Sequence, residues 1–172
     1  MLVTLIADIG PVSAAAPLRS SADLGKTEAV CRPNETGPAL LIDVDGLKDR
    51  KGTLRAELYP ATDADFLADD NILIQQGKVF RRVAADIPAT GQTSLCLRVP
   101  RAGHYTVSLL HDRDHNLKFS LFSDGIGFAG NPALGRSRPR AAAATVTVGA
   151  GVTRVGITLN YLRGFSFRPL SP

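Results

Sequence analysis

The stretch His104-Tyr-Thr-Val-Ser-Leu-Leu-His-Asp112 gives the clearest indication of a β fold. Successive side chains of a β-strand point to opposite faces, so a period of two in side-chain size indicates a strand with one buried face. The turn-forming run Pro100-Arg-Ala-Gly103 comes directly before this stretch and marks the start of the strand. The residues predicted to share the inward face are Tyr105, Val107, Leu109 and His111.

The same alternation recurs on both sides of this segment, with Pro, Gly or charged turn residues in the intervals. The further predicted strands are residues 40–44, 54–58, 79–87, 93–99, 143–148 and 153–162. One or two helical turns are expected after Asp63, which is a candidate helix N-cap. Seven short strands without long helices predict an all-β fold, in which two antiparallel sheets pack face to face.

The size and composition of the chain predict one globular domain. The chain has 172 residues, of which 44% are hydrophobic and 21% charged, close to the averages for globular proteins. These values exclude a broadly disordered chain and a bundle of membrane helices. We expect a single β-sandwich domain over residues 37–172, preceded by a loosely ordered or processed lead-in over residues 17–36, which is rich in Ser, Ala, Gly and Pro.

The first residues have the pattern of an export signal. The apolar run Met1-Leu-Val-Thr-Leu-Ile-Ala7 is followed by Val12-Ser-Ala-Ala-Ala16, which resembles an A-x-A cleavage site, although Asp8 interrupts the run. We therefore predict a signal peptide over residues 1–16 and a periplasmic or secreted protein. Elsewhere, no apolar run reaches the length of about 20 residues that a membrane-spanning helix needs, so no transmembrane helix is expected in the mature chain.

The chain has two cysteines, Cys31 and Cys96. In an exported protein such a pair favours a disulfide over a metal site, which would use more sulfur or nitrogen ligands. Leu95 and Leu97 share the apolar face of their predicted strand, so Cys96 points to the other face. A bridge would hold the N-terminal segment across the outside of the sheet. The alternative is two unpaired thiols.

Several motifs together resemble one bacterial family. They are Val44-Asp-Gly-Leu47, Lys51-Gly-Thr-Leu-Arg-Ala-Glu-Leu-Tyr59, Pro100-Arg-Ala-Gly-His-Tyr-Thr-Val107, His111-Asp112 with Asn116, and Gly125-Ile-Gly-Phe-Ala-Gly-Asn-Pro132. The chain resembles the DUF2141 family, a bacterial family of unknown function. The resemblance implies an exported, immunoglobulin-like or transthyretin-like β-sandwich, and it implies no activity. Leu117 departs from the family pattern, because members commonly have Gly there.

The loop after residue 111 contains candidate metal ligands. Asp112, Asp114 and Asn116 have the spacing of the first ligands of a calcium loop. Leu117 and Ser123 replace the Gly and the bidentate carboxylate that an EF-hand would need, although Asp124 is a possible substitute. One hypothesis is a calcium-stabilised structural domain. The alternative is a polar turn whose Asp and Asn side chains cap their own backbone.

A second metal hypothesis uses the histidines. His111, Asp112 and His115 are the candidate transition-metal ligands, and a metal-assisted hydrolase would use them together with Asp114. The alternative is that His111 is a hydrogen-bonded structural residue. The full set of candidate metal ligands is His111, Asp112, Asp114, His115 and Asn116.

A glycine-rich loop offers a candidate binding surface. In residues 124–132 the glycines permit close approach of a partner, and Phe128 is predicted at the loop tip. The candidate binding residues are Phe128, Asn131, Arg136, Arg138 and Arg140. The alternative is a crossover loop with tight turns. The basic run 136–140 has no interleaved aromatic residue, so no nucleic-acid partner is expected.

No sequence pattern ties a Ser or Cys nucleophile to a base. We therefore expect a non-enzymatic binding or structural module of the cell envelope, without a required cofactor, that presents residues 111–140 to an envelope component or a small ligand. The metal-assisted hydrolase and the calcium-stabilised domain are the alternatives.

Overall fold

The computed structural model describes residues 16–170, so the predicted leader lies outside the described residues except for Ala16. Strands are the main regular secondary structure of the described chain. The strands are β1 (Ala39–Asp45), β2 (Thr53–Pro60), β3 (Arg81–Asp86), β4 (Thr93–Arg98), β5 (Gly103–Asp112), β6 (Gly125–Phe128), β7 (Thr145–Val148), β8 (Val152–Thr158), β9 (Asn160–Arg163) and β10 (Ser166–Pro169). The short α1 (Asp70–Gln75) and the 3-10 helix η1 (Ala141–Ala144) complete the set.

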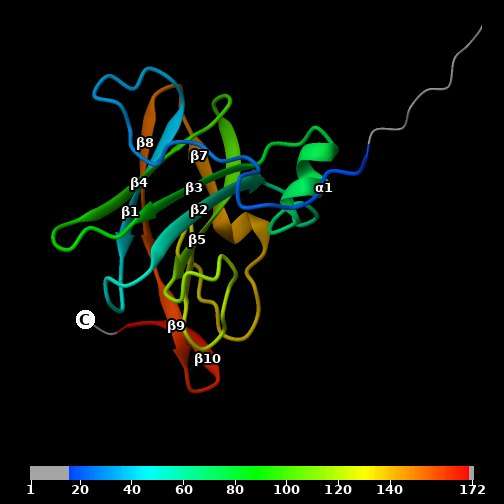
Figure 1. Cartoon of the computed structure of the whole chain (residues 1–172). Helices are drawn as coiled ribbons and strands as arrows, with labels where there is room; N and C mark the ends of the chain where they lie inside the picture. Colours follow the sequence, from blue (N-terminus) through cyan, green and yellow to red (C-terminus); the bar gives the residue numbers. More distant parts are fainter. Residues whose placement is uncertain (1–15, 171–172) are drawn as a thin grey trace, which may run out of the picture.

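The strands form two sheets, as the sequence predicts. The smaller sheet has the order β4-β1-β8, and the larger has the order β10-β9-β6-β5-β2-β3, with β7 paired to the first part of β5. Figure 1 shows β8 leading directly into β9, so one continuous segment passes from the small sheet to the large one.

The described residues form ten strands where the sequence predicted seven. The predicted strand 153–162 is divided into β8 and β9 because the chain changes sheets there, and β6 and β10 were not predicted. The arrangement is also not purely antiparallel, since β1 and β8 pair in parallel. The chain reverses direction at the turn over residues 149–151 as it leaves β7, and this brings β8 into the same direction as β1.

The core between the sheets contains the inward faces that alternation predicted. Tyr105, Val107 and Leu109 of β5 are buried there, opposite Leu95 and Leu97 of β4. The predicted strand 104–112 is thus confirmed as β5, which lies between β6 and β2 in the large sheet.

A second apolar cluster covers the outer face of the large sheet. Tyr59 and Phe128 of the sheet pack there against Phe66 and Phe80, with edge-on ring contacts. Side chains of β5 are therefore buried on both faces of the strand, the inner face lying in the core between the sheets. The helical turns were predicted too early in the chain: α1 begins at Asp70, and the Asp63 carboxylate instead accepts a hydrogen bond from the Ala141 amide at the start of η1.

The lead-in segment contacts both sheets. Residues 25–27 exchange backbone hydrogen bonds with Arg82 of β3, and the amide of Cys96 in β4 donates to the carbonyl of Ala29. Cys31 and Cys96 form the predicted disulfide, on the outer face of the small sheet. None of the helices in residues 16–170 is long and apolar enough to cross a membrane.

Candidate functional site

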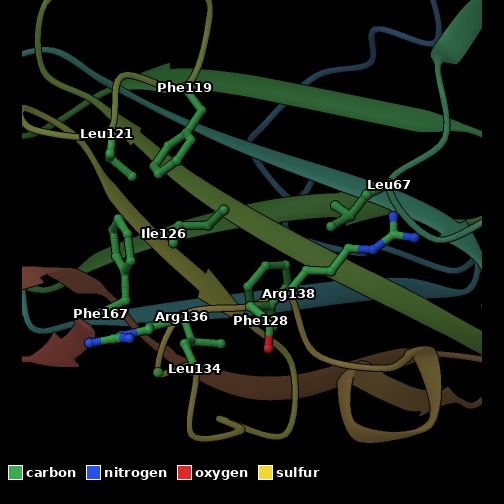
Figure 2. A pocket seen from close by; sticks show the side chains of 11 residues that line it. Leu67, Phe119, Leu121, Ile126, Phe128, Leu134, Arg136, Arg138 and Phe167 are labelled. Carbon is green, nitrogen blue, oxygen red and sulfur yellow. The ribbon is translucent and has the colours of Figure 1, made fainter. Parts of the chain in front are cut away.

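An apolar cavity of about 290 Å³ lies on the outer face of the large sheet. Figure 2 shows the lining side chains pointing toward one another from the sheet, from the loop after β5 and from the segment before η1. Small-molecule sites are typically apolar concavities of about 300 Å³ or more with a few polar groups, so this cavity is at the small end of that range. The principal lining side chains are Leu67, Phe119, Leu121, Ile126, Phe128, Leu134, Arg136, Arg138 and Phe167.

Local strand geometry positions the floor of the cavity. Ile126 and Phe128 are two residues apart in β6 and therefore share its outer face. Gly127 faces the other way, where a Cβ atom would meet the side chain of Ile157 in the core. The glycine is required because β8 passes directly over the inner face of β6.

The C-terminal strand closes one side of the cavity. The Phe167 ring lies 5.7 Å, between centroids, from the ring of Phe119. The Phe167 amide donates a hydrogen bond to the carbonyl of Gly135, which ties β10 to the segment that carries Arg136 and Arg138.

Two arginines supply the polar groups of the lining. Arg138 extends across the cavity toward Leu67 (Figure 2), and its Nη1 lies 3.4 Å from the carbonyl oxygen of Phe66. The guanidinium of Arg136 lies 6.0 Å from the centroid of the Phe165 ring. Among residues 16–170, no carboxylate forms an ion pair with either arginine. Their charge is therefore available to an anionic group in the cavity.

The structure brings three of the five predicted binding residues together. Phe128, Arg136 and Arg138 line the cavity. Asn131 does not, because its amide group bonds the backbone of Gly156 and Thr158 at the edge of β8. Arg140 lies in a neighbouring depression shared with Arg138.

The prediction that Phe128 is displayed at a loop tip is wrong. Its side chain is only 3% exposed, because Gly125–Phe128 forms β6 and the ring packs against Phe66. Sequence reasoning also missed Phe119, Leu121 and Leu134 as lining residues. The only signal for this wall was the pair of aromatic residues in Phe165-Ser-Phe167, of which one folds back onto the sheet and the other is exposed.

The acidic loop after β5 lies beside this wall. Asp112 and Asp124 are buried and Asp114 is exposed, and one carboxylate oxygen of each lies within 4.8 Å of the others. Asp124, from the far end of the loop, thus lies close to Asp112 and Asp114, as a substitute carboxylate ligand would. The Asn116 amide group donates to Asp114, and its Oδ1 accepts a hydrogen bond from the Lys118 amide.

Backbone amides hold the buried carboxylates in place. Asp112 accepts hydrogen bonds from the amides of Asn116 and Leu117, and Asp124 accepts from those of Arg113 and Ser120. These are the self-capping contacts of a polar turn. Each carboxylate oxygen has more than one lone pair, so the same oxygens can also face a hard cation.

His111 is in a different environment. Its side chain is fully buried, with Nδ1 2.7 Å from the Tyr161 hydroxyl and Nε2 2.7 Å from the carbonyl oxygen of Lys51. A carbonyl only accepts, so Nε2 carries the proton and Nδ1 accepts from Tyr161. Burial lowers the pKa of His111, which keeps the ring neutral.

The histidines do not converge with the carboxylates. His115 is exposed, with a left-handed backbone (φ 57°), whereas His111 is enclosed in the core. No histidine belongs to a potential metal-binding cluster within residues 16–170. The hydrolase hypothesis therefore gains no support from this part of the chain.

The comparison with family models decides the relationship of the chain. A model described as an uncharacterized protein conserved in bacteria, DUF2141, matches residues 42–156. The chain belongs to the DUF2141 family. The match begins within β1, includes β2 to β7, the acidic loop and most of β8, and ends before β9 and β10. The DUF2141 match therefore contains the floor of the cavity but not the wall that Phe167 forms. The chain matched no curated protein and no solved structure.

Proposed function

We propose that this DUF2141 protein is a non-enzymatic, exported binding module of the cell envelope, whose ligand is a small amphiphile with an anionic head. The observation that carries the proposal is the apolar cavity with two arginines that have no carboxylate partner within residues 16–170. An acyl chain would contact Phe119, Phe128 and Phe167. Its carboxylate or phosphate would face the forked donors of Arg138 on the Leu67 side of the cavity, or those of Arg136 on the Phe167 side.

Two further features support the setting of this proposal. The disulfide between Cys31 and Cys96 is typical of proteins in oxidising compartments such as the periplasm. The two sheets facing each other across one core support an immunoglobulin-like or transthyretin-like sandwich over residues 37–172. In such folds, variable segments at the edges and ends of a rigid sandwich carry recognition.

Titration calorimetry with decanoate tests the proposal. We expect saturable binding of decanoate and weak or absent binding of decyltrimethylammonium, which has the same apolar chain and the opposite charge. The double variant Arg136→Gln, Arg138→Gln should bind decanoate about tenfold more weakly, because a charge-assisted contact typically contributes about 1.5 kcal/mol or more. Decanol, which has no charge, should bind both proteins equally.

The matched control is Arg140→Gln, since Arg140 lies outside the cavity but in the same basic run. This variant should bind decanoate as the unmodified protein does. Failure of the unmodified protein to bind decanoate, or equal binding of the anionic and cationic amphiphiles, would contradict the proposal.

A calcium-stabilised domain is the second candidate function. The convergence of the Asp112, Asp114 and Asp124 carboxylates favours it, because calcium prefers several oxygen ligands at one point. If the loop binds calcium, the melting temperature should rise with millimolar calcium and fall with chelator. The exposed Asp114 permits a clean variant, and Asp114→Asn should remove the calcium response. An unchanged melting temperature in calcium and in chelator would reject this candidate.

A further inference from the structure

Two phenylalanine side chains are almost fully exposed at one end of the molecule. Phe122, in the loop between β5 and β6, is 85% exposed, and Phe165, in the turn between β9 and β10, is 84% exposed. Figure 1 shows the β9–β10 turn projecting beyond the rest of the large sheet. Single exposed apolar residues are common on protein surfaces, whereas a group of them that is rimmed by polar residues marks an interaction site.

These two residues belong to one surface. Both line a shallow depression of about 410 Å³ that adjoins the ligand cavity and shares Leu121, Gly135, Arg136 and Phe167 with it. Leu121, which is 47% exposed, lies on the same surface. We call the surface formed by Leu121, Phe122, Leu162 and Phe165 the aromatic tip.

Positive charge predominates around the aromatic tip. The exposed cations on the segments that carry it or beside it are Lys118, Arg136, Arg163 and Arg168. Two carboxylates lie in the loop that carries Phe122. Asp124 is buried and bonded to backbone amides, whereas Asp114 is exposed and accepts hydrogen bonds from Ser120 and Ser123, which flank Leu121 and Phe122.

We infer that the aromatic tip docks the protein onto an anionic lipid bilayer. Exposed aromatic side chains insert at the boundary between head groups and acyl chains, and nearby Lys and Arg side chains contact the lipid phosphates. Here Phe122 and Phe165 project from adjacent turns, so both enter the same leaflet while the cations lie beside them. In a membrane, the acyl chains would contact the two phenylalanines, and the anionic head groups above them would contact the cations.

This inference goes beyond the proposed ligand, although the two sites adjoin and Leu121 and Arg136 line both. The two exposed phenylalanines, Phe122 and Phe165, do not line the cavity. Docking would nevertheless place the cavity beside the bilayer.

Co-sedimentation with lipid vesicles tests the inference on the full chain. Vesicles of phosphatidylcholine with about 30% phosphatidylglycerol should bind the protein, and pure phosphatidylcholine vesicles should bind it at least about tenfold more weakly, because they have no net negative surface charge to attract the cations. Binding should fall at about 0.5 M salt, where screening shortens the range of the surface potential. The double variant Phe122→Ser, Phe165→Ser should bind vesicles at least about tenfold more weakly, because it removes the two aromatic groups that would enter the bilayer.

The control variant is Val30→Ser, which removes an equally solvated apolar side chain (76% exposed) from the lead-in segment. It should bind vesicles as the unmodified protein does. Circular dichroism melting and decanoate binding should be unchanged in the double Phe variant, which separates loss of docking from loss of folding or of the ligand site.

Several results would overturn the inference. Vesicle binding that the double Phe variant retains would show that the aromatic tip is not the contact. A concentration-dependent dimer in sedimentation velocity that the same variant abolishes would assign the surface to a second copy of the chain instead. Absence of binding to anionic vesicles at low salt would reject docking outright.

Discussion

The buried hydrogen bonds of His111 are the most constrained feature at the scale of single residues. The ring bridges the Tyr161 hydroxyl on β9 and the Lys51 carbonyl ahead of β2, and the same hydroxyl accepts a hydrogen bond from the Lys48 amide. Burial raises the pKa of Tyr161 to about 12, so the hydroxyl stays protonated and keeps donating to the neutral imidazole. This chain of contacts ties the turn between β1 and β2 to the large sheet.

The lowered pKa of His111 predicts a pH-dependent stability. The unfolded chain takes up a proton near the ordinary pKa of about 6.5, whereas folded His111 resists protonation. The contribution of His111 is therefore fully present above about pH 6.5 and is lost as the pH falls toward the lower folded-state pKa. The free energy of unfolding, measured with denaturant between about pH 7.5 and 5, should decrease, and His111→Gln should reduce that dependence.

His115→Gln is the matched control, because His115 is exposed and has no buried contact to lose. The same pH dependence in both variants would contradict a role for His111. The range avoids Asp49, whose ion pair with Arg113 lowers its pKa to about 2 and whose contribution is lost only below about pH 4.

Residue identity alone did not reveal how the acidic loop is shaped. Leu117, at the position where the calcium-loop pattern requires Gly, has a left-handed backbone, with φ 62°. The fold therefore imposes the glycine-like conformation on a leucine, held by the bond from its amide to Asp112 and the bond that its carbonyl accepts from Arg55. The resemblance located the loop, and the tertiary contacts determined its conformation.

At the scale of elements, the lead-in segment joins two sheet edges. It pairs with β3 of the large sheet and reaches the disulfide on β4 of the small sheet. Arg98 of β4 adds a paired contact to Glu35, with Nη2 2.7 Å from a carboxylate oxygen. Removal of the covalent link should therefore weaken the closure of the sandwich on this side.

The double variant Cys31→Ser, Cys96→Ser should lower the free energy of unfolding by about 4 kcal/mol, from the entropy of the loop that the disulfide closes. The sequence separation of the two cysteines is 65 residues. Guanidinium unfolding with and without reductant measures the effect. Reductant should leave the double variant unchanged, and full alkylation of both thiols without reduction would show that the bridge is absent.

Strand prediction succeeded where side chains alternate and failed where glycine replaces them. Gly125-Ile-Gly-Phe128 has the composition of a turn, yet it forms β6. A Cβ atom at Gly125 would meet the Tyr161 ring at 2.5 Å, so the glycine serves close packing against β9. That requirement is set by a residue far away in the sequence.

At the scale of the whole molecule, the sequence predicted two sheets and the core between them, because each strand shows its buried face locally. It did not predict the cavity, whose walls come from the loop after β5, β6, the 134–138 segment and β10. Phe119 and Phe167 are distant in the sequence, and the pairing of β5, β6, β9 and β10 in the large sheet brings their rings together. A site assembled from such distant segments has no local pattern in the sequence.

The parallel pairing of β1 with β8 also determines when the small sheet can form during synthesis of the chain. β1 is the middle strand of the small sheet, and one of its partners lies more than a hundred residues further along the chain. Contacts of such long sequence separation slow folding, because a large loop must be closed before they form. A chain that is synthesised from its N-terminus therefore cannot complete its small sheet until β8 has left the ribosome. The topology itself delays completion of the fold until most of the chain has been made.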